Sequence, residues 1–198
     1  VENCGGSTAL TTGGLVSATH KITLSNPSVP PPPGEVLVTV DLDAGARLVY
    51  TNPSGLTTTV EVPVGAVSRV TTLAFTPLQA LTAPITSGLR FAQHAFDLDA
   101  YQEGAQVQGF AFERPVTVTV RYAEADVAQM DPHTLRLYYW ADARSRWVDV
   151  ASTCDPPSAY VRRPAERWFS VALCHLSRFG AFGDATHMIY LPLVRKDG

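Results

Sequence analysis

The sequence predicts an all-β protein: an antiparallel β-sandwich with an N-terminal and a C-terminal arm. Three observations predict it. Helical periodicity is nearly absent, because prolines or glycines interrupt every candidate stretch of about eleven residues. Alternating or β-branched segments recur along the chain instead. Turn-forming residues separate these segments, and the 198 residues include 14 glycines and 15 prolines.

Seven strands are expected, each from its own pattern. Residues 35–41 alternate apolar and polar side chains, and residues 57–62 are rich in threonine and valine. In residues 115–122, valines at every second position predict one buried and one exposed face. The remaining strands are expected at residues 135–140, 147–150, 168–173 and 179–182. Short strands at such intervals are typical of a sandwich.

Turns and one short helix are expected between the strands. Residues 52–55 (NPSG) have proline and glycine at the positions that a four-residue turn favours. Residues 41–45 and 101–104 are further expected breaks. Residues 123–130 are the one candidate for a helix, and its length is one or two turns because Pro132 stops it.

Two boundaries divide the chain into three parts. Residues 27–33 (PSVPPPP) form a stiff polyproline segment that cannot pair inside a sheet, so residues 1–34 are expected to form an arm with a hinge. The sandwich is expected at residues 35–183, and residues 184–198 form an apolar C-terminal tail that needs a partner surface. The residues of this candidate assembly strand are Met188, Ile189, Tyr190, Leu191, Leu193 and Val194.

Charge and motif content argue against several classes of protein. The net charge of −3 provides no basic excess for neutralising phosphates, so nucleic-acid binding is not expected. No apolar run approaches the roughly 20 residues that span a bilayer. The five histidines lack zinc spacing, and no nucleophile-elbow, phosphate-loop or dinucleotide motif occurs. We therefore expect a protein that is not an enzyme and needs no cofactor.

Two acidic pairs, Asp97 with Asp99 and Asp41 with Asp43, are interpreted as loop residues. Calcium requires roughly six to eight oxygen ligands, which the loops of β-sandwich proteins can supply. Neither pair fits the spaced acidic pattern of a known calcium loop. Turn or capping roles are therefore the first interpretation, and calcium near Asp97 and Asp99 is the alternative.

Three cysteines allow one disulfide and one remaining thiol. We expect Cys154 to pair with Cys174, which closes a loop of about twenty residues and contributes roughly 3 kcal/mol through chain entropy. Two buried free thiols in a reducing compartment are the alternative. Cys4 then stays free or becomes a contact between subunits.

Residues 46–78 resemble the first half of the ZU-five β-domain, which occurs with UPA domains in ankyrins and netrin receptors. The shared feature is a strand followed by residues 62–66 (VPVGA) and a threonine-rich strand. The second half is similar to secreted modules of filamentous, often thermophilic bacteria of the Chloroflexota type. Its markers are residues 96–99, 115–118, 135–140, 174–179 and 190–194. The resemblance implies a secreted, non-enzymatic module of the cell wall or surface.

The segment His175-Leu176-Ser177 is similar to the self-cleavage site of GAIN domains and of ZU-five/UPA proteins. The resemblance implies that His175 acts as general base while the Ser177 oxygen attacks the carbonyl carbon of Leu176. A strained turn would favour this acyl shift, and water would then cleave the ester. The alternative is a structural role, with Leu176 in the core.

The sequence therefore favours an extracellular structural module of a cell-surface layer, sheath or filament. Assembly by strand exchange, through self-association or with other surface proteins, is the expected mechanism. Two alternatives stay open: a self-cleaving domain cut between Leu176 and Ser177, and a glycan-binding adhesin module. Cross-strand pairing and core packing are the first interpretation of the large aromatic residues, and sugar stacking is the alternative. These aromatic residues are Tyr138, Tyr139, Trp140, Trp147 and Trp168.

Overall fold

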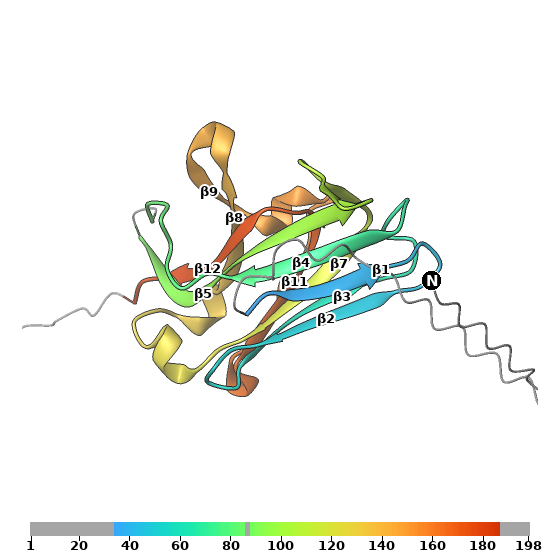
Figure 1. Cartoon of the computed structure of the whole chain (residues 1–198). Helices are drawn as coiled ribbons and strands as arrows, with labels where there is room; N and C mark the ends of the chain where they lie inside the picture. Colours follow the sequence, from blue (N-terminus) through green and yellow to red (C-terminus); the bar gives the residue numbers. More distant parts are fainter. Residues whose placement is uncertain (1–33, 86–87, 187–198) are drawn as a thin grey trace, which may run out of the picture.

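The computed structural model describes residues 34–85 and 88–186, and they form two antiparallel sheets that pack face to face (Figure 1). This arrangement confirms the predicted β-sandwich. The first sheet has the order β1 (Val36–Val40), β4 (Thr71–Pro77), β5 (Leu89–Gln102), β12 (Arg178–Asp184), β8 (Arg136–Ala141) and β9 (Arg146–Asp149), with β6 (Ala105–Gln106) paired to the end of β5. The second sheet has the order β10 (Val161–Arg163), β11 (Trp168–His175), β7 (Ala111–Arg121), β3 (Thr57–Val62) and β2 (Ala46–Thr51).

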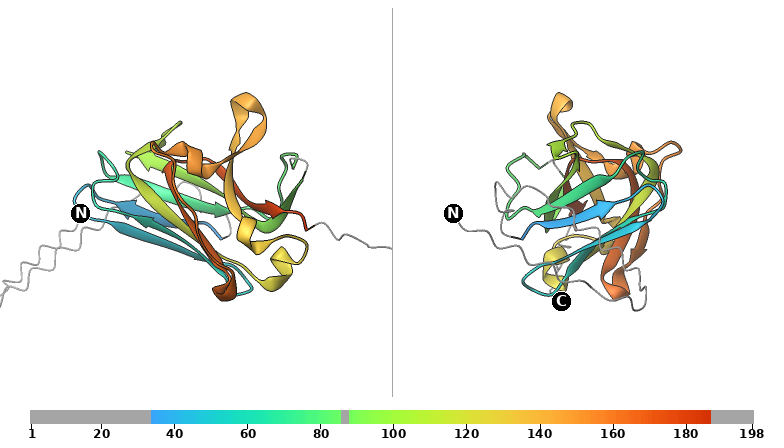
Figure 2. Two further views of the ribbon diagram at one scale, coloured as in Figure 1. Left: turned by 180° about the vertical axis from the view of Figure 1, so that it is seen from behind. Right: turned by 45° about the vertical axis from the view of Figure 1, so that its right-hand side comes forward.

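Short 3-10 helices lie between several strands. They are η1 (Glu124–Val127), η2 (Pro132–Thr134), η3 (Asp142–Arg144), η4 (Val150–Thr153) and η5 (Pro164–Glu166). The helix predicted at residues 123–130 is therefore the single turn η1. The β8–β9 hairpin carries η3 at its tip and projects from the body of the sandwich, as Figure 1 and Figure 2 show.

Alternation in the sequence correctly identified five inner strands, β3, β7, β8, β11 and β12, but the inner strands β4 and β5 were not predicted. In β7 the side chains of Val116, Val118 and Val120 are fully buried, as the period of two predicts. The predicted turn at residues 52–55 is also present. The Asn52 side-chain oxygen accepts hydrogen bonds from the backbone N–H groups of Ser54 and Leu56, at 3.0 and 2.9 Å. Such local side-chain bonds replace the ladder bonds that the backbone loses in a turn.

A row of four aromatic rings runs through the core from the second sheet into the first. Tyr50 of β2 stacks on Phe75 of β4, with ring centroids 5.0 Å apart. Phe75 stacks on Phe96 of β5 at 4.6 Å, and Phe96 contacts Phe179 of β12 at 5.3 Å. We call these residues the aromatic row. Its three phenylalanines are buried, so it joins one edge of the sandwich to the centre of the first sheet.

Both predicted arms fall largely outside the described residues. This applies to Cys4 in the N-terminal arm and to the candidate assembly strand at residues 188–194. Within residues 34–85 and 88–186, no helix is long and apolar enough to cross a membrane.

Candidate functional site

The segment His175-Leu176-Ser177 lies where the chain crosses from one sheet to the other. β11 of the second sheet ends at His175, and β12 of the first sheet begins at Arg178. The backbone N–H of Leu176 donates to the carbonyl oxygen of Phe110 at 3.1 Å. The carbonyl oxygen of Ser177 accepts from the N–H of Leu98, also at 3.1 Å. The crossing is therefore held at both of its residues by neighbouring strands and loops.

The side chains at the crossing do not form a nucleophile–base pair. Nδ1 of His175 lies 3.2 Å from the carbonyl oxygen of Leu176, and the His175 ring packs edge-on against Tyr139. Oγ of Ser177 donates instead to the carbonyl oxygen of Trp140 at 3.3 Å. A carbonyl oxygen is too weak a base to remove a hydroxyl proton, and self-cleavage requires a base within reach of that oxygen. Self-cleavage at this site stays a prediction that this geometry does not favour.

We expect the intact chain to give a single mass of 21.3 kDa by mass spectrometry under denaturing conditions. The reason is that Ser177 Oγ is bonded to a carbonyl group and His175 faces the peptide carbonyl rather than the hydroxyl. Ser177→Ala is the control, and its mass pattern is expected to match that of the parent chain. Two fragments in the parent chain that disappear in Ser177→Ala would establish cleavage.

Asp97 and Asp99 lie in the middle of β5, so their interpretation as loop residues is wrong. Phe96, Leu98 and Ala100 are buried, and the two aspartates between them face the outer side of the first sheet. The alternation of apolar and acidic side chains is the strand signal that the sequence interpretation missed. Acidic residues are rare in strands, and for this reason the segment resembled a loop.

Polar partners hold both carboxylates. Nε and Nη2 of Arg178 donate to the two oxygens of Asp97, at 2.8 and 3.0 Å, in a bidentate pair. Nε2 of Gln106 donates to Oδ1 of Asp99 at 2.9 Å. Burial raises the pKa of Asp99 above its usual value, against the lowering effect of Gln106. Among the described residues, no group of three or more His, Cys, Asp or Glu side chains is placed to hold a metal ion.

These groups border a polar cavity of about 490 Å³ beside the crossing, which we call the sheet-crossing pocket. It brings together two features that the sequence presented separately: the candidate cleavage segment and the candidate calcium residues. Its lining includes Asp97, Asp99, Gln106, Trp140, Asp142, Ser177 and Arg178. Arg178 was not singled out from the sequence, because its role depends on the pairing of β12 with β5.

The five large aromatic residues do not form one stacking platform. Trp140 and Trp147 are a cross-strand pair of the β8–β9 hairpin, with centroids 5.4 Å apart. Trp147 is buried and its indole N–H donates to the carbonyl oxygen of Pro84 at 3.1 Å. Trp168 belongs to the second sheet, where it donates to Glu166 at 2.8 Å. Trp140 alone among the five lines the sheet-crossing pocket.

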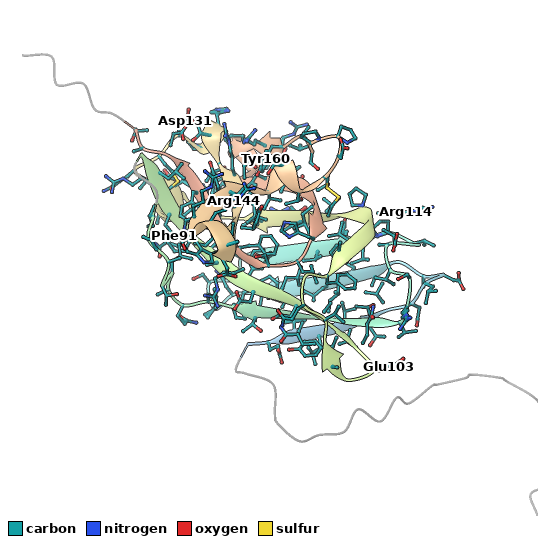
Figure 3. All side chains as sticks on the ribbon, turned by 90° about the horizontal axis from the view of Figure 1, so that it is seen from above. Phe91, Glu103, Arg114, Asp131, Arg144 and Tyr160 are labelled. Carbon is teal, nitrogen blue, oxygen red and sulfur yellow. A yellow bond between two sulfur atoms is a disulfide. The ribbon has the colours of Figure 1, made fainter. Side chains whose placement is uncertain are left out.

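A disulfide joins Cys154 and Cys174, as expected from the sequence (Figure 3). Cys154 follows η4 and Cys174 lies in β11, and their Cα atoms are 5.2 Å apart. The backbone N–H of Cys174 also donates to Oγ1 of Thr153 at 3.1 Å. The bond therefore ties the segment that follows the first sheet's β9 to the second sheet.

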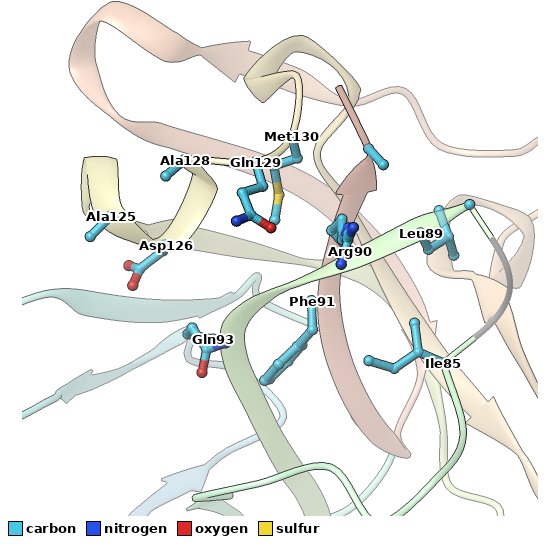
Figure 4. Close-up of a pocket in the computed structure, with 12 residues that line it drawn as sticks. Ile85, Leu89, Arg90, Phe91, Gln93, Ala125, Asp126, Ala128, Gln129 and Met130 are labelled. Carbon is cyan, nitrogen blue, oxygen red and sulfur yellow. The ribbon is translucent and has the colours of Figure 1, made fainter. Parts of the chain in front are cut away.

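A second cavity, of about 860 Å³, lies at the start of β5, and we call it the edge pocket (Figure 4). Its lining includes Ile85, Phe91, Asp126, Met130 and Ala185. This pocket has no signal in the sequence, because its walls come from segments that are distant along the chain. No local pattern marks them.

Asp126 attaches η1 to β5 at one wall of the edge pocket. Its Oδ2 accepts the backbone N–H of Ala123 at 2.7 Å and lies 3.3 Å from Nε2 of His94. Burial lowers the pKa of His94, and Asp126 partly offsets that effect. These contacts fix the position of η1, so this wall of the pocket is preformed.

A comparison with protein-family models finds no match for this chain, and a comparison with curated proteins finds none.

Proposed function

We propose that the protein is a non-enzymatic structural module of an extracellular, cell-surface assembly. In this assembly, residues 188–194 of one copy add as a strand to β5 of the next copy. The observation that carries the proposal is an edge of β5 that no described strand pairs with, beside the apolar side of the edge pocket. The disulfide supports an oxidising, extracellular location, because structural disulfides are rare in reducing compartments.

The first half of β5 has a strand neighbour on one side. β12 pairs with β5 as far as Leu89. On the other side, β4 pairs with β5 only between Phe96 and Tyr101. In the described part of the chain, no strand pairs with residues 89–93 on that second side. Backbone groups at such an edge accept a further strand, which is the basis of β-augmentation.

Apolar side chains near this edge provide a surface for a donor strand. Ile85, Phe91 and Met130 line the edge pocket, and the side chain of Ile85 is exposed (Figure 4). In a strand, Ile189, Leu191 and Leu193 share one face, so they can enter an apolar pocket together. If the backbone groups of these three residues form the hydrogen bonds to β5, the backbone nitrogen of Pro192 points away from β5. Proline has no N–H, so in this register no hydrogen bond of the ladder is lost.

The free edge of β5 lies within reach of two tails, that of a neighbouring copy and the chain's own. The backbone N–H of Ala185 donates to the carbonyl oxygen of Gly88, at the end of β5 where β12 pairs with it, and Met130 forms a bridge with Ala185 on the other side. The free edge of β5 lies two strand spacings, about 10 Å, from Ala185. The three residue steps from Ala185 to Met188 span at most about 11 Å. The state of association therefore distinguishes the two tails, and the proposal assigns the edge to the neighbouring copy.

The test compares the full chain with a variant that lacks residues 187–198. Sedimentation velocity is expected to show concentration-dependent association of the full chain and a monomer for the truncated chain. Circular dichroism and the unfolding midpoint are expected to be unchanged, because every described strand of the sandwich ends before residue 187. A single substitution, Leu191→Asp, is expected to abolish association, whereas Pro192→Ser retains it.

Deletion of residues 1–33 is the matched control, and association is expected to persist without them. Continued association of the chain lacking residues 187–198 would overturn the proposal. A full chain that stays monomeric at millimolar concentration, with its own tail protected from proteolysis, would assign the tail to its own edge pocket and overturn it equally.

A further inference from the structure

We propose that the sheet-crossing pocket binds a neutral saccharide, with one pyranose ring resting against Trp140 and its hydroxyl groups bonded to Asp97, Asp99 and Arg178. This site does not depend on the assembly strand or on the edge pocket. Its volume of about 490 Å³ lies within the range of small-molecule sites, about 300–1,000 Å³.

The pocket is built on rigid elements. Asp97 and Asp99 come from β5, Arg178 from β12, and Trp140 from β8, and these strands belong to one sheet. The wall that carries Gln106 is held by β6 and by the bond from the Val107 N–H to the Ala100 carbonyl oxygen at 2.8 Å. Sites on strands keep their geometry better than sites on loops, so little ordering is required on binding.

The guanidinium group of Arg178 is oriented by Asp97, but only some of its N–H donors form hydrogen bonds. Its bidentate contact with Asp97 uses two of its five N–H donors. The remaining donors have no partner among the described side chains. Asp97 thus fixes the guanidinium plane while leaving N–H groups for a ligand oxygen.

Acceptors lie beside these donors. Asp99 has one oxygen bonded to Gln106, and its second carboxylate oxygen has no partner among the described residues. A hydroxyl group both donates and accepts, so adjacent hydroxyls on a sugar ring match a carboxylate oxygen next to a guanidinium. Trp140 lines the same pocket and offers a flat apolar surface for the C–H face of the ring.

The charges of the pocket favour a neutral ligand over an ion. Asp97, Asp99 and Asp142 line it against one cation, Arg178, so an anionic ligand would be repelled. A divalent cation would have to displace Arg178 from Asp97. A polyhydroxylated, uncharged molecule can instead use both the donors and the acceptors without separating that pair.

The experiment measures binding of three probes, methyl β-glucoside, methyl β-galactoside and methyl α-mannoside, to the full chain by saturation-transfer difference NMR. A glycan array extends the search to longer saccharides. We expect at least one saccharide to bind with a Kd of about 1 mM or tighter, in the range of a single-ring contact. Asp99→Asn and Trp140→Ala are each expected to weaken binding at least tenfold.

Two matched variants outside the pocket control for nonspecific effects. Asp43→Asn removes an exposed carboxylate, and Trp168→Ala removes a tryptophan of the second sheet. Neither is expected to change affinity. Unfolding midpoints confirm that each variant is folded. No binding on the array or to the three glycosides overturns the proposal, and so does binding that Asp99→Asn and Trp140→Ala leave unchanged.

Discussion

Replacing Phe179 with alanine is expected to lower the free energy of unfolding by about 3–5 kcal/mol. Phe179 is fully buried near the start of β12, and its ring contacts Phe96 at the end of the aromatic row. The substitution removes apolar contacts and leaves a cavity. β5 and β8 pair with β12 on its two sides, so the strands cannot easily close that cavity. Urea unfolding monitored by circular dichroism measures the loss.

Two further variants are controls for the effect of Phe179→Ala on the free energy of unfolding. Phe179→Leu keeps most of the apolar volume, and a loss below about 2 kcal/mol is expected. Leu37→Ala truncates a large apolar side chain of β1 that is 53% exposed, and its effect is expected to lie within about 0.5 kcal/mol. If Phe179→Ala costs no more than Leu37→Ala, the aromatic row does not stabilise the sandwich as argued.

Removing the disulfide is expected to cost about 3 kcal/mol. The cysteines are separated by 20 positions, and the bond restricts the unfolded chain by closing that loop. Cys154→Ala, Cys174→Ala and the double variant are each expected to lose the same amount, because either substitution removes the whole bond. Equilibrium unfolding without reductant provides the comparison.

Cys4→Ala is the control for thiol chemistry, and it is expected to leave the unfolding free energy unchanged. Thiol titration of the denatured, non-reduced chain is expected to find one free thiol, since three cysteines less the two in the bond leave one. If the losses of unfolding free energy in the two single variants add up in the double variant, the two cysteines do not share one bond. Three titratable thiols would contradict the disulfide equally.

Much of the sandwich could be predicted because burial in a strand has a local period of two. The three valines of β7 are the clearest case: they alternate in the sequence and are all buried in the structure. β5 shows the limit of that reasoning. Its apolar residues at 96, 98 and 100 also alternate, but aspartates at 97 and 99 are typical of loops, and the strand was missed.

The candidate sites could be predicted only in part. Cys154 and Cys174 were identified as partners because three cysteines leave few pairings. Arg178 was not identified as the partner of Asp97, because 81 positions separate them and only strand register makes them face each other. The edge pocket has no sequence signal of its own. It lies at the start of β5, and β4 pairs with β5 only from Phe96 onward.

The sequence by itself determined the fold class, most strand positions, the turn at residues 52–55 and the cysteine pair. These features depend on neighbours along the chain or on a count of residues. Only the tertiary structure decided that the crossing at Leu176–Ser177, the acidic residues of β5 and Trp140 border one pocket. It also decided that the Ser177 hydroxyl donates a hydrogen bond to the carbonyl oxygen of Trp140, 37 positions away, rather than to His175. Cross-strand register and sheet packing bring these residues together, and the local sequence pattern of a single strand determines neither.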